Sequence, residues 1–501
     1  MDLAMLLNKR RLVFDGGTGS SLVEKGLKPG EMPETWNLLK PEVIEGLHRA
    51  YIEAGADIIK TNTFGAYSFK LKEKQTETVP AALTNAKRAV AACGKDTLIA
   101  LDVGPLGKLL YPFGDTTFDE AVGYFKELIA LGKDGADLIL IETMNDLYEI
   151  KAAVVAAKEC SDLPIAVTVA LDERGRLLTG ADVETVVTFL EGIGVSALGV
   201  NCGFGPKAVK PFVQKMVSLS GVPVIANPNA GLPEQKDGRA VYSLTPELYA
   251  AEIGEILSLG TSLVGGCCGT TPAHIGAISD AVKKEAATCE APSPRTAFTS
   301  FRKTAAFGKD ALAVGGNLDP LRNLDVVAYY QDGDIDSLVD ECLVMAAEVD
   351  AIALSDAADV SSDGEFLSEL VIALQEMTEL PFVLTLSTPA ALDRVMRIYN
   401  GKPIVIPTFS LEEALPAVAR YGGAVGILIE GGFSPEAALD KVEKAKALAK
   451  TFGIKEADVI ALTEDAAVAE VFQTKGYAVM LTKDIAGDKL SSENLAVTVT
   501  V

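Results

Sequence analysis

The first 290 residues alternate eight times between a short apolar, β-branched run and a longer segment with helical spacing. The eight runs are LVFDGG (12–17), DIIKTNTF (57–64), LIALDVG (98–104), LILIETM (138–144), IAVTVAL (165–171), ALGVNC (197–202), VIANPNA (224–230) and SLVGGCC (262–268). Eight strand–helix units within about 250 residues are what a (β/α)8 barrel requires. A doubly wound open sheet is the alternative, but it rarely uses eight units so evenly. We therefore predict a TIM barrel over residues 1–288.

The alternation resumes after residues 289–309, a segment with proline, serine and threonine that we predict to be a linker. The later apolar runs lie at 311–318, 326–330, 351–357, 382–388, 404–409, 424–430, 458–462, 478–482 and 495–501. They predict a second, smaller α/β domain over residues 310–501, built as a compact or incomplete barrel. The expected fold class is therefore α/β, with a TIM barrel followed by a barrel-like domain.

Composition narrows the possible partners. The 45 Lys and Arg residues face 69 Asp and Glu residues, and the formal charge of −24 repels nucleic acid and anionic lipid surfaces. No stretch approaches the roughly 20 apolar residues of a membrane-spanning helix, and the N-terminus lacks a signal-peptide pattern. Seven cysteines, an odd number, do not indicate a disulfide framework. We expect a cytoplasmic protein that binds neither nucleic acid nor membrane.

Three of the cysteines stand at predicted strand ends. Cys202 closes the sixth run, and Cys267 and Cys268 close the eighth, so in a barrel all three meet on one face. Zinc binds thiolates at about 2.3 Å, and a catalytic zinc site supplies three protein ligands and leaves one position open. A disulfide between adjacent cysteines is disfavoured, because their Cα atoms lie about 3.8 Å apart and bridges need about 4.4 Å. The trio predicts a zinc site, and three small buried hydrophobic residues are the alternative.

The neighbouring glycines and the ligand set indicate what such a zinc ion would do. Gly265, Gly266 and Gly269 permit the unusual dihedral angles that could turn both vicinal sulfurs inward. Three thiolates leave zinc a weak Lewis acid and a poor source of hydroxide. Zinc does deprotonate a further thiol, whose free pKa is about 8.5. Alkylation of sulfur is therefore favoured over hydrolysis.

Six motifs resemble those of the homocysteine S-methyltransferase family, most of all the homocysteine-binding module at the front of cobalamin-dependent methionine synthase. They are DGGTGSSL (15–22), KTNTFGA (60–66), ETM (142–144), GVNCGFGP (199–206), NPNAG (227–231) and GGCCGTTPAHI (265–275). The resemblance covers residues 8–286. It implies zinc on the three cysteines, with the homocysteine sulfur as the fourth ligand.

The resemblance also implies roles for single residues. Glu142 looks like the family's acid that helps to hold the substrate ammonium, and a charged rim residue is its alternative role. Asp15, Gly16 and Gly17 resemble the first-strand substrate loop, in which backbone N–H groups approach a carboxylate. Asn229 matches an asparagine that can occupy the open zinc position before substrate arrives. Three further candidates on the same face, each of which could be ordinary polar lining, are Thr63, Asp102 and Asn201.

The second domain resembles the pterin-binding barrel that follows in cobalamin-dependent methionine synthase. The asparagine and aspartate pattern that holds the pterin ring is largely replaced here, so we expect a degenerate pterin site. Acids remain at strand ends, and in so acidic a chain we expect them to be solvated; they are Asp319, Asp356, Glu430 and Asp465. We find no covalently attached cobalamin module, so a corrinoid is expected on a separate protein.

These observations predict a zinc-dependent homocysteine S-methyltransferase that forms methionine. The expected external donor is a methylcorrinoid carried by a separate protein, or methyltetrahydrofolate. One alternative is a cobalamin-independent enzyme that uses S-methylmethionine or betaine. The other is a non-catalytic, zinc-bearing scaffold subunit.

Overall fold

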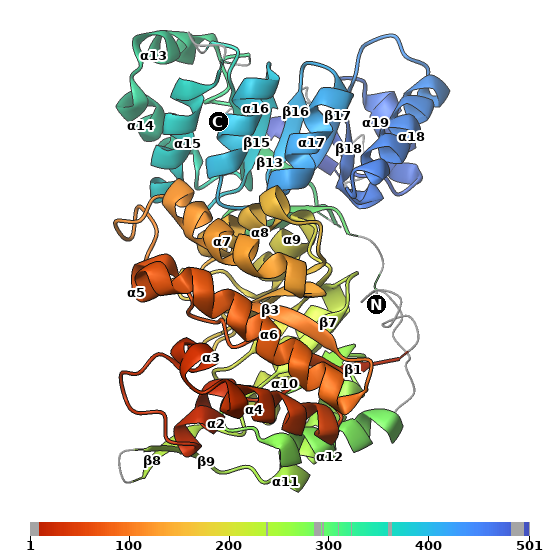
Figure 1. Cartoon of the computed structure of the whole chain (residues 1–501). Coiled ribbons are helices and arrows are strands. Elements are labelled where there is room, and N and C mark those ends of the chain that lie inside the picture. The colour runs from red at the N-terminus through yellow and green to blue at the C-terminus, as the bar shows by residue number, and fades with distance from the viewer. Residues whose placement is uncertain are drawn as a thin grey trace. The chain divides into compact units, whose positions relative to one another are not determined.

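The computed structural model describes residues 10–236, 239–284, 292, 295–308, 310–321, 323–358, 363–481 and 495–499. The chain divides into two compact units (Figure 1). The first contains Met1–Val187 and Val195–Pro292, and the second contains Thr188–Gly194 and Ser293–Val501. The short segment Thr188–Gly194, which the sequence assigns to the first barrel, is thus grouped with the second unit.

The first unit is the predicted parallel barrel, and each of the eight predicted runs contains a strand. The strands are β1 (Leu12–Val13), β2 (Ile58–Lys60), β3 (Leu98–Val103), β4 (Leu138–Met144), β5 (Ile165–Val169), β6 (Ala197–Asn201), β7 (Val224–Asn227) and β10 (Leu263–Val264). They pair in the order β1-β10-β7-β6-β5-β4-β3-β2. A bridge from Phe14 to Ile58 joins the first strand to the second and closes the ring.

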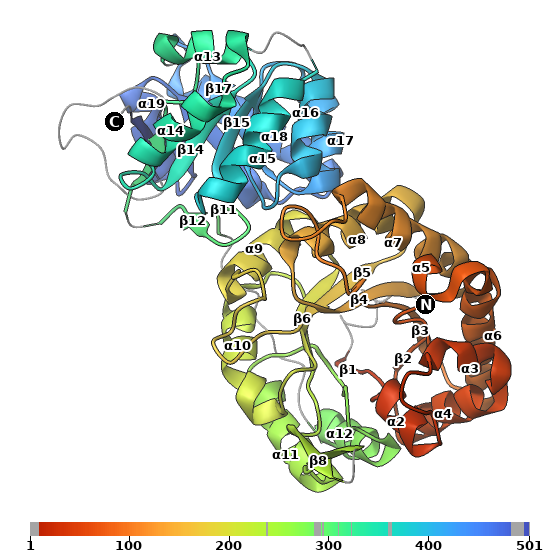
Figure 2. The same cartoon turned by 90° about the vertical axis from the view of Figure 1, so that its left-hand side faces the viewer.

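One long helix of ten or more residues follows each strand, and Figure 2 shows these helices around the ring of strands. They are α4 (Pro41–Ala54), α6 (Gln75–Cys93), α7 (Phe118–Gly132), α8 (Leu147–Cys160), α9 (Val183–Gly192), α10 (Pro206–Leu219), α11 (Pro246–Leu257) and α12 (Pro272–Lys284). Residues two apart on a strand share a face, so pairs such as Leu138 and Leu140 point into the barrel. These inward residues form one buried cluster, which places the core inside the ring.

Insertions after the first and seventh strands build up the carboxyl end of this barrel. Between β1 and α4 lie α2 (Thr18–Glu24), the 3-10 helix η1 (Pro33–Thr35) and α3 (Trp36–Leu39). Between β7 and α11 lies a hairpin of β8 (Pro233–Lys236) and β9 (Arg239–Tyr242). Smaller elements after β2 and α7 are α5 (Ser68–Leu71), η2 (Lys72–Lys74) and η3 (Lys133–Gly135).

The second unit is a closed parallel barrel with a hydrophobic cluster of its own, so the predicted barrel-like domain is complete in its strand pairing. Its strands, in pairing order, are β13 (Leu312–Gly315), β14 (Ala351–Ser355), β15 (Phe382–Leu386), β16 (Ile404–Pro407), β17 (Ala424–Ile429), β18 (Val459–Thr463), β19 (Val479–Leu481) and β20 (Leu495–Val499). Its helices are α13 (Val327–Asp332), α14 (Ile335–Met345), α15 (Glu365–Met377), α16 (Pro389–Ile398), α17 (Leu411–Tyr421), α18 (Pro435–Thr451) and α19 (Ala466–Thr474), with 3-10 turns η4 (Leu324–Val326) and η5 (Glu456–Asp458).

Two expectations for the second half need correction. The run at 326–330 is not a strand, because Val326 ends the 3-10 turn Leu324–Val326 and the other four residues begin α13. Within it only Val326 and Tyr330 are fully buried, four residues apart, which is helical spacing. Part of the segment predicted as a linker forms an antiparallel hairpin of β11 (Ala297–Thr299) and β12 (Thr304–Ala306), whereas 289–291, 293–294 and 309 lie outside the described residues.

No helix in the described part of the chain combines the length and the apolar composition needed to cross a lipid bilayer.

Candidate active site

Three cysteine sulfurs converge at the carboxyl end of the first barrel. Cys202 follows β6 directly, and Cys267 and Cys268 follow β10 after two glycines. Their ligand sulfurs all lie within 4.8 Å of one another. Two of the three backbones are held by hydrogen bonds to the seventh strand and the residue after it: the N–H of Cys202 donates to the carbonyl of Asn227, and that of Cys267 to the carbonyl of Pro228. The structure therefore brings together three side chains from distant parts of the sequence.

The glycines around the vicinal pair serve two different purposes. Gly269 has a φ of +80°, the left-handed conformation that we predicted for this turn. Gly265 and Gly266 have no such φ, contrary to the expectation. A Cβ on Gly266 would lie 2.3 Å from the Thr270 hydroxyl, and one on Gly265 would lie 2.5 Å from Cβ of Phe14. These two positions require glycine because of close packing.

The three thiols suit a bound cation. A hydrogen bond with Cys267 lowers the pKa of Cys202, but a bond with Cys268 and burial raise it, to about 11 overall. For Cys268, a hydrogen bond with Cys202 lowers the pKa, while a bond with Cys267 and burial raise it to about 12. Crowded thiols stay protonated at neutral pH unless a positive charge stabilises their thiolates. Sulfur donors at this spacing fit zinc.

A buried ammonium lies between two of the predicted substrate-binding acids. Lys60 ends β2, and its Nζ is 3.4 Å from Oε2 of Glu142 and 3.9 Å from Oδ1 of Asp15. The backbone N–H of Lys60 also donates to Oδ2 of Asp15 at 2.9 Å. Burial lowers the pKa of Lys60, but the carboxylates of Glu142 and Asp15 raise it more, so the ammonium stays charged. Lys60 lies within the motif at 60–66, but no role was predicted for it, because its contacts depend on three strand ends that meet only in the folded barrel.

A pocket of about 200 Å³ joins the thiols to this charged cluster. The three cysteines line it together with Lys60, Glu142 and Asp102. Oδ1 of Asp102 and Oε2 of Glu34, another lining residue, are buried without a hydrogen-bond partner among the described residues. The volume is below the roughly 300 Å³ at which pockets for drug-sized ligands begin, so it suits a ligand the size of an amino acid.

The remaining predicted residues lie near the pocket but use their polar groups within the chain. The Thr63 hydroxyl donates to the carbonyl of Asp102 at 2.7 Å. Oδ1 of Asn229 accepts from the N–H of Cys268 at 3.1 Å. The N–H of Gly17 donates to the Thr270 hydroxyl at 3.1 Å, and Gly16 packs against the same side chain. Of this group only Gly17 lines the pocket, beside Thr18 and Gly19, for which no role was predicted.

Asn201 is also fully engaged. Its Oδ1 accepts from the N–H of Thr143 at 2.8 Å and from the hydroxyl of Thr168 at 2.9 Å. Its Nδ2 donates to Oγ1 of Thr143 at 2.7 Å. The side chain is 1% exposed, so we place it behind the pocket wall.

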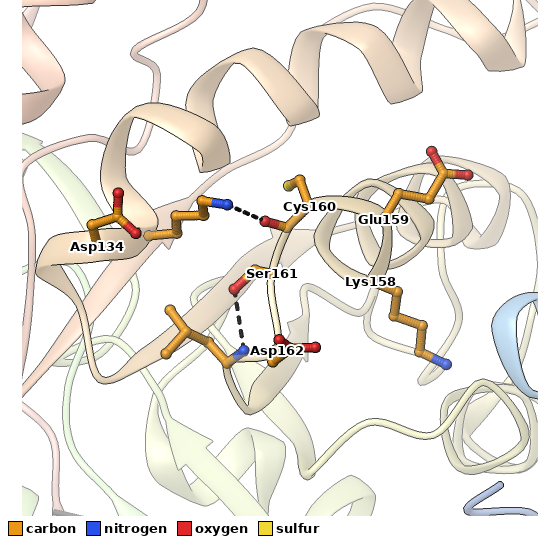
Figure 3. Close-up of a pocket in the computed structure, with 8 residues that line it drawn as sticks. Asp134, Lys158, Glu159, Cys160, Ser161 and Asp162 are labelled. Carbon is orange, nitrogen blue, oxygen red and sulfur yellow. Dashed lines mark hydrogen bonds between the residues drawn. The ribbon is translucent and has the colours of Figure 1, made fainter.

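A second hollow in the first unit lies at the opposite end of the strands, where α8 leads into β5 (Figure 3). Nζ of Lys133 donates to the carbonyl of Cys160 at 2.6 Å, and the N–H of Leu163 donates to the Ser161 hydroxyl at 3.1 Å. Active sites of α/β barrels lie at the carboxyl ends of the strands, so this hollow is not the candidate active site.

The strand-end acids of the second barrel differ in exposure. Asp319 and Asp356 are buried, contrary to the expectation of solvated acids, and Oδ2 of Asp356 accepts from the Ser387 hydroxyl at 2.9 Å. Glu430 and Asp465 are exposed, and Asp465 caps the N-terminus of α19.

Comparison with known proteins finds relatives of the first barrel. Residues 12–282 match the family model described as homocysteine S-methyltransferase. Methionine synthase of Mycobacterium tuberculosis (strain ATCC 25618 / H37Rv) is 34% identical over 304 residues, which are 56% of this chain and 25% of that protein. Methionine synthase of Mycobacterium leprae (strain TN) is 33% identical over the same shares of both chains. The chain thus spans about a quarter of the length of these relatives.

Two solved structures of the homocysteine methyltransferase MmuM from Escherichia coli are also similar. The metallated form is 22% identical with a TM-score of 0.48, and it covers 56% of this chain and 98% of that one. The apo form is 24% identical with a TM-score of 0.46, and it covers 56% of this chain and 99% of that one.

The fold and the site define a TIM-barrel protein with a three-thiol candidate metal centre at the carboxyl end of its strands. The family match spans more than half of the chain, and the chain belongs to the homocysteine S-methyltransferase family. The resemblance and the methyltransferase class predicted from the motifs are therefore confirmed.

Proposed function

We propose that this chain transfers a methyl group to the sulfur of homocysteine in a zinc-dependent reaction that forms methionine. The observation that carries the proposal is the pocket itself, which has three thiols on one wall and a buried cluster of acids around Lys60 on another. Cys202, Cys267 and Cys268 would hold the zinc ion. When bound, zinc lowers the pKa of a coordinated thiol, so that the thiol is a nucleophilic thiolate at neutral pH.

The chain's own residues bind and orient the substrate. Glu142 lines the pocket and supplies negative charge for the ammonium of homocysteine, whereas Asp15 is fully buried outside the lining and acts through Lys60, which offsets the repulsion between the two acids. The loop at Gly17, with Thr18 and Gly19, lines the pocket where the substrate carboxylate would lie. A substrate held by its ammonium and its carboxylate keeps its sulfur in one place. The methyl donor then meets a sulfur that is already oriented for reaction.

The chemistry needs little further proton transfer. The reaction forms one bond between sulfur and the methyl carbon and breaks the bond between that carbon and the donor, which keeps the electron pair. Positioning of the two reactants therefore supplies much of the rate gain.

A methylcorrinoid on a separate protein is the donor we favour, because the family resemblance is to the homocysteine-binding module of a cobalamin-dependent enzyme. A second class of donor has support from one observation. Oε2 of Glu34 and Oδ1 of Asp102 are unpartnered carboxylate oxygens in the described part of the pocket. Burial raises the pKa of both carboxyl groups, and a cationic donor such as S-methylmethionine or betaine would stabilise their ionised form.

A donor assay tests the proposal. Zinc-loaded protein is incubated with homocysteine and, in separate tubes, a methylated corrinoid protein, methylcobalamin, S-methylmethionine, betaine or methyltetrahydrofolate. Methionine formed with the corrinoid protein alone supports the proposal, and methionine formed with a cationic donor alone supports the second class.

The metal requirement has its own control. Cys202→Ala, Cys267→Ala and Cys268→Ala are each expected to lose both bound zinc and methionine formation. Full activity in a metal-free variant would contradict zinc dependence. A zinc ion that never exchanges a ligand for added homocysteine would instead indicate a non-catalytic scaffold.

A further inference from the structure

The residue that follows the substrate acid has a strained backbone. Thr143 comes directly after Glu142 in β4, and its φ is +63°. β-Branched L-residues rarely adopt this left-handed conformation, because the side chain crowds the backbone. The pairing of β4 with β5 shifts register between Ile141 and Met144, so the irregularity is confined to this point. Such a conformation persists only where neighbouring contacts hold it in place.

The side chain of Asn201 hydrogen-bonds both the backbone and the hydroxyl of Thr143. A backbone N–H can only donate, so the Asn201 atom 2.8 Å from the Thr143 nitrogen must be the amide oxygen. That orientation directs Nδ2 to the Thr143 hydroxyl at 2.7 Å. The same Nδ2 lies 3.9 Å from the sulfur of Cys267. Asn201 also ends β6, and the next residue is Cys202.

We propose that Thr143 and Asn201 form a clamp that fixes the carboxylate of Glu142 relative to the three sulfurs. This inference rests on the proposed function, in which Glu142 binds the substrate ammonium while the sulfurs face the substrate thiol. Thr143 lines the pocket beside Glu142, but its N–H and hydroxyl are both engaged by Asn201, so we assign both clamp residues a positioning role. If Thr143 relaxed to a negative φ, the peptide that joins it to Glu142 would rotate. The carboxylate of Glu142 would then no longer point into the pocket.

The first test measures thermal unfolding of the metal-free full chain, because a strained residue has a distinctive substitution pattern. Thr143→Ala and Thr143→Gly both remove the hydroxyl, but only glycine removes the strain. We expect Thr143→Gly to melt about 3 °C above Thr143→Ala. Equal melting temperatures, or a lower one for the glycine variant, would overturn the claim of strain.

The second test measures binding to the zinc-loaded chain by calorimetry, with homocysteine and with 4-sulfanylbutanoate, which lacks the amino group. Thr143→Ser keeps the hydroxyl and is expected to bind both ligands as the parent protein does. Thr143→Ala and Thr143→Gly are expected to bind homocysteine about tenfold more weakly. Their affinity for 4-sulfanylbutanoate and their zinc content should stay unchanged, because the clamp positions Glu142, which binds the amino group that only homocysteine has.

The outcomes separate the two proposals. An equal loss for both ligands, or no loss for homocysteine, overturns the clamp. Failure of the parent protein to bind homocysteine refutes the proposed function instead, and in that case the melting order of the variants still tests the strain at Thr143.

Discussion

At the scale of single residues, Lys60 controls the charge of the pocket. Its side chain is 4% exposed and lies between Asp15 and Glu142. Lys60→Met would leave two buried carboxylates without their counter-ion, so we expect the free energy of unfolding to fall by about 3 kcal/mol. Homocysteine should also bind more weakly, because the acids would become protonated. Urea unfolding and calorimetry check both effects.

An exposed ion pair is the matched control for Lys60. Lys444 pairs with Asp440 at 2.7 Å, and both side chains are more than 60% exposed. Lys444→Met should change the free energy of unfolding by less than about 0.5 kcal/mol. Equal effects of the two lysine substitutions would show that burial of the cluster has no energetic consequence.

His48 is expected to make the first barrel sensitive to acid. The residue lies in α4, is 1% exposed, and has no partner for Nε2 among the described residues. Burial lowers its pKa to about 4, whereas an unfolded histidine titrates near about 6.5. The unfolded chain therefore binds the extra proton between these values, so stability is complete above about pH 6.5 and falls as the pH drops toward 4.

His48→Leu removes this proton uptake. Between about pH 7 and pH 5 the parent chain should lose about 2 kcal/mol more unfolding free energy than the variant does. Urea titrations of the two metal-free proteins at both pH values measure the difference. Parallel losses would mean that His48 is protonated as easily in the folded chain as in the unfolded one.

At the scale of elements, the contact between β6 and β7 sets the position of Cys202. A Cβ on Gly199 would lie 2.0 Å from the backbone oxygen of Ile225, and backbone cannot yield as a flexible side chain would. Gly199→Ala should push the two strands apart, lower the free energy of unfolding by about 2 kcal/mol and weaken zinc binding about tenfold or more. Competition with a chromogenic chelator measures the zinc affinity.

Gly123 in α7 is the control for that substitution, since nothing lies within 4 Å of its hypothetical Cβ. Gly123→Ala should leave zinc affinity unchanged and raise the unfolding free energy by about 1 kcal/mol through helix propensity. A Gly199→Ala protein with parental zinc affinity would show that the thiols tolerate movement of β6.

At the scale of the whole molecule, each barrel has its own buried hydrophobic cluster. Zinc should therefore stabilise only the barrel that holds the cysteines. With free zinc about a thousandfold above its dissociation constant, the gain is about 4 kcal/mol, and one of two calorimetric transitions should rise by about 10 °C. Cys268→Ala should abolish this rise and leave the other transition in place. A single transition that moves as a whole would contradict the prediction.

The strands of both barrels were predictable because their signal is local. Apolar β-branched runs and helical spacing are visible within a dozen residues, and eight repeats leave few possible folds. The error at 326–330 has the same origin, since five apolar residues form a strand or a helix turn equally well and only burial of Val326 and Tyr330 separates the two.

The sequence alone determined the barrel, the family and the candidate zinc ligands, because parallel barrel topology brings strand ends, and hence Cys202, Cys267 and Cys268, to one face. Only the tertiary structure decided the rest. Lys60 meets Glu142 across 82 positions of sequence, and Asn201 meets Thr143 across 58. No local sequence pattern predicts either contact, because side-chain distances and a strained φ are set only when the strands have closed into a ring.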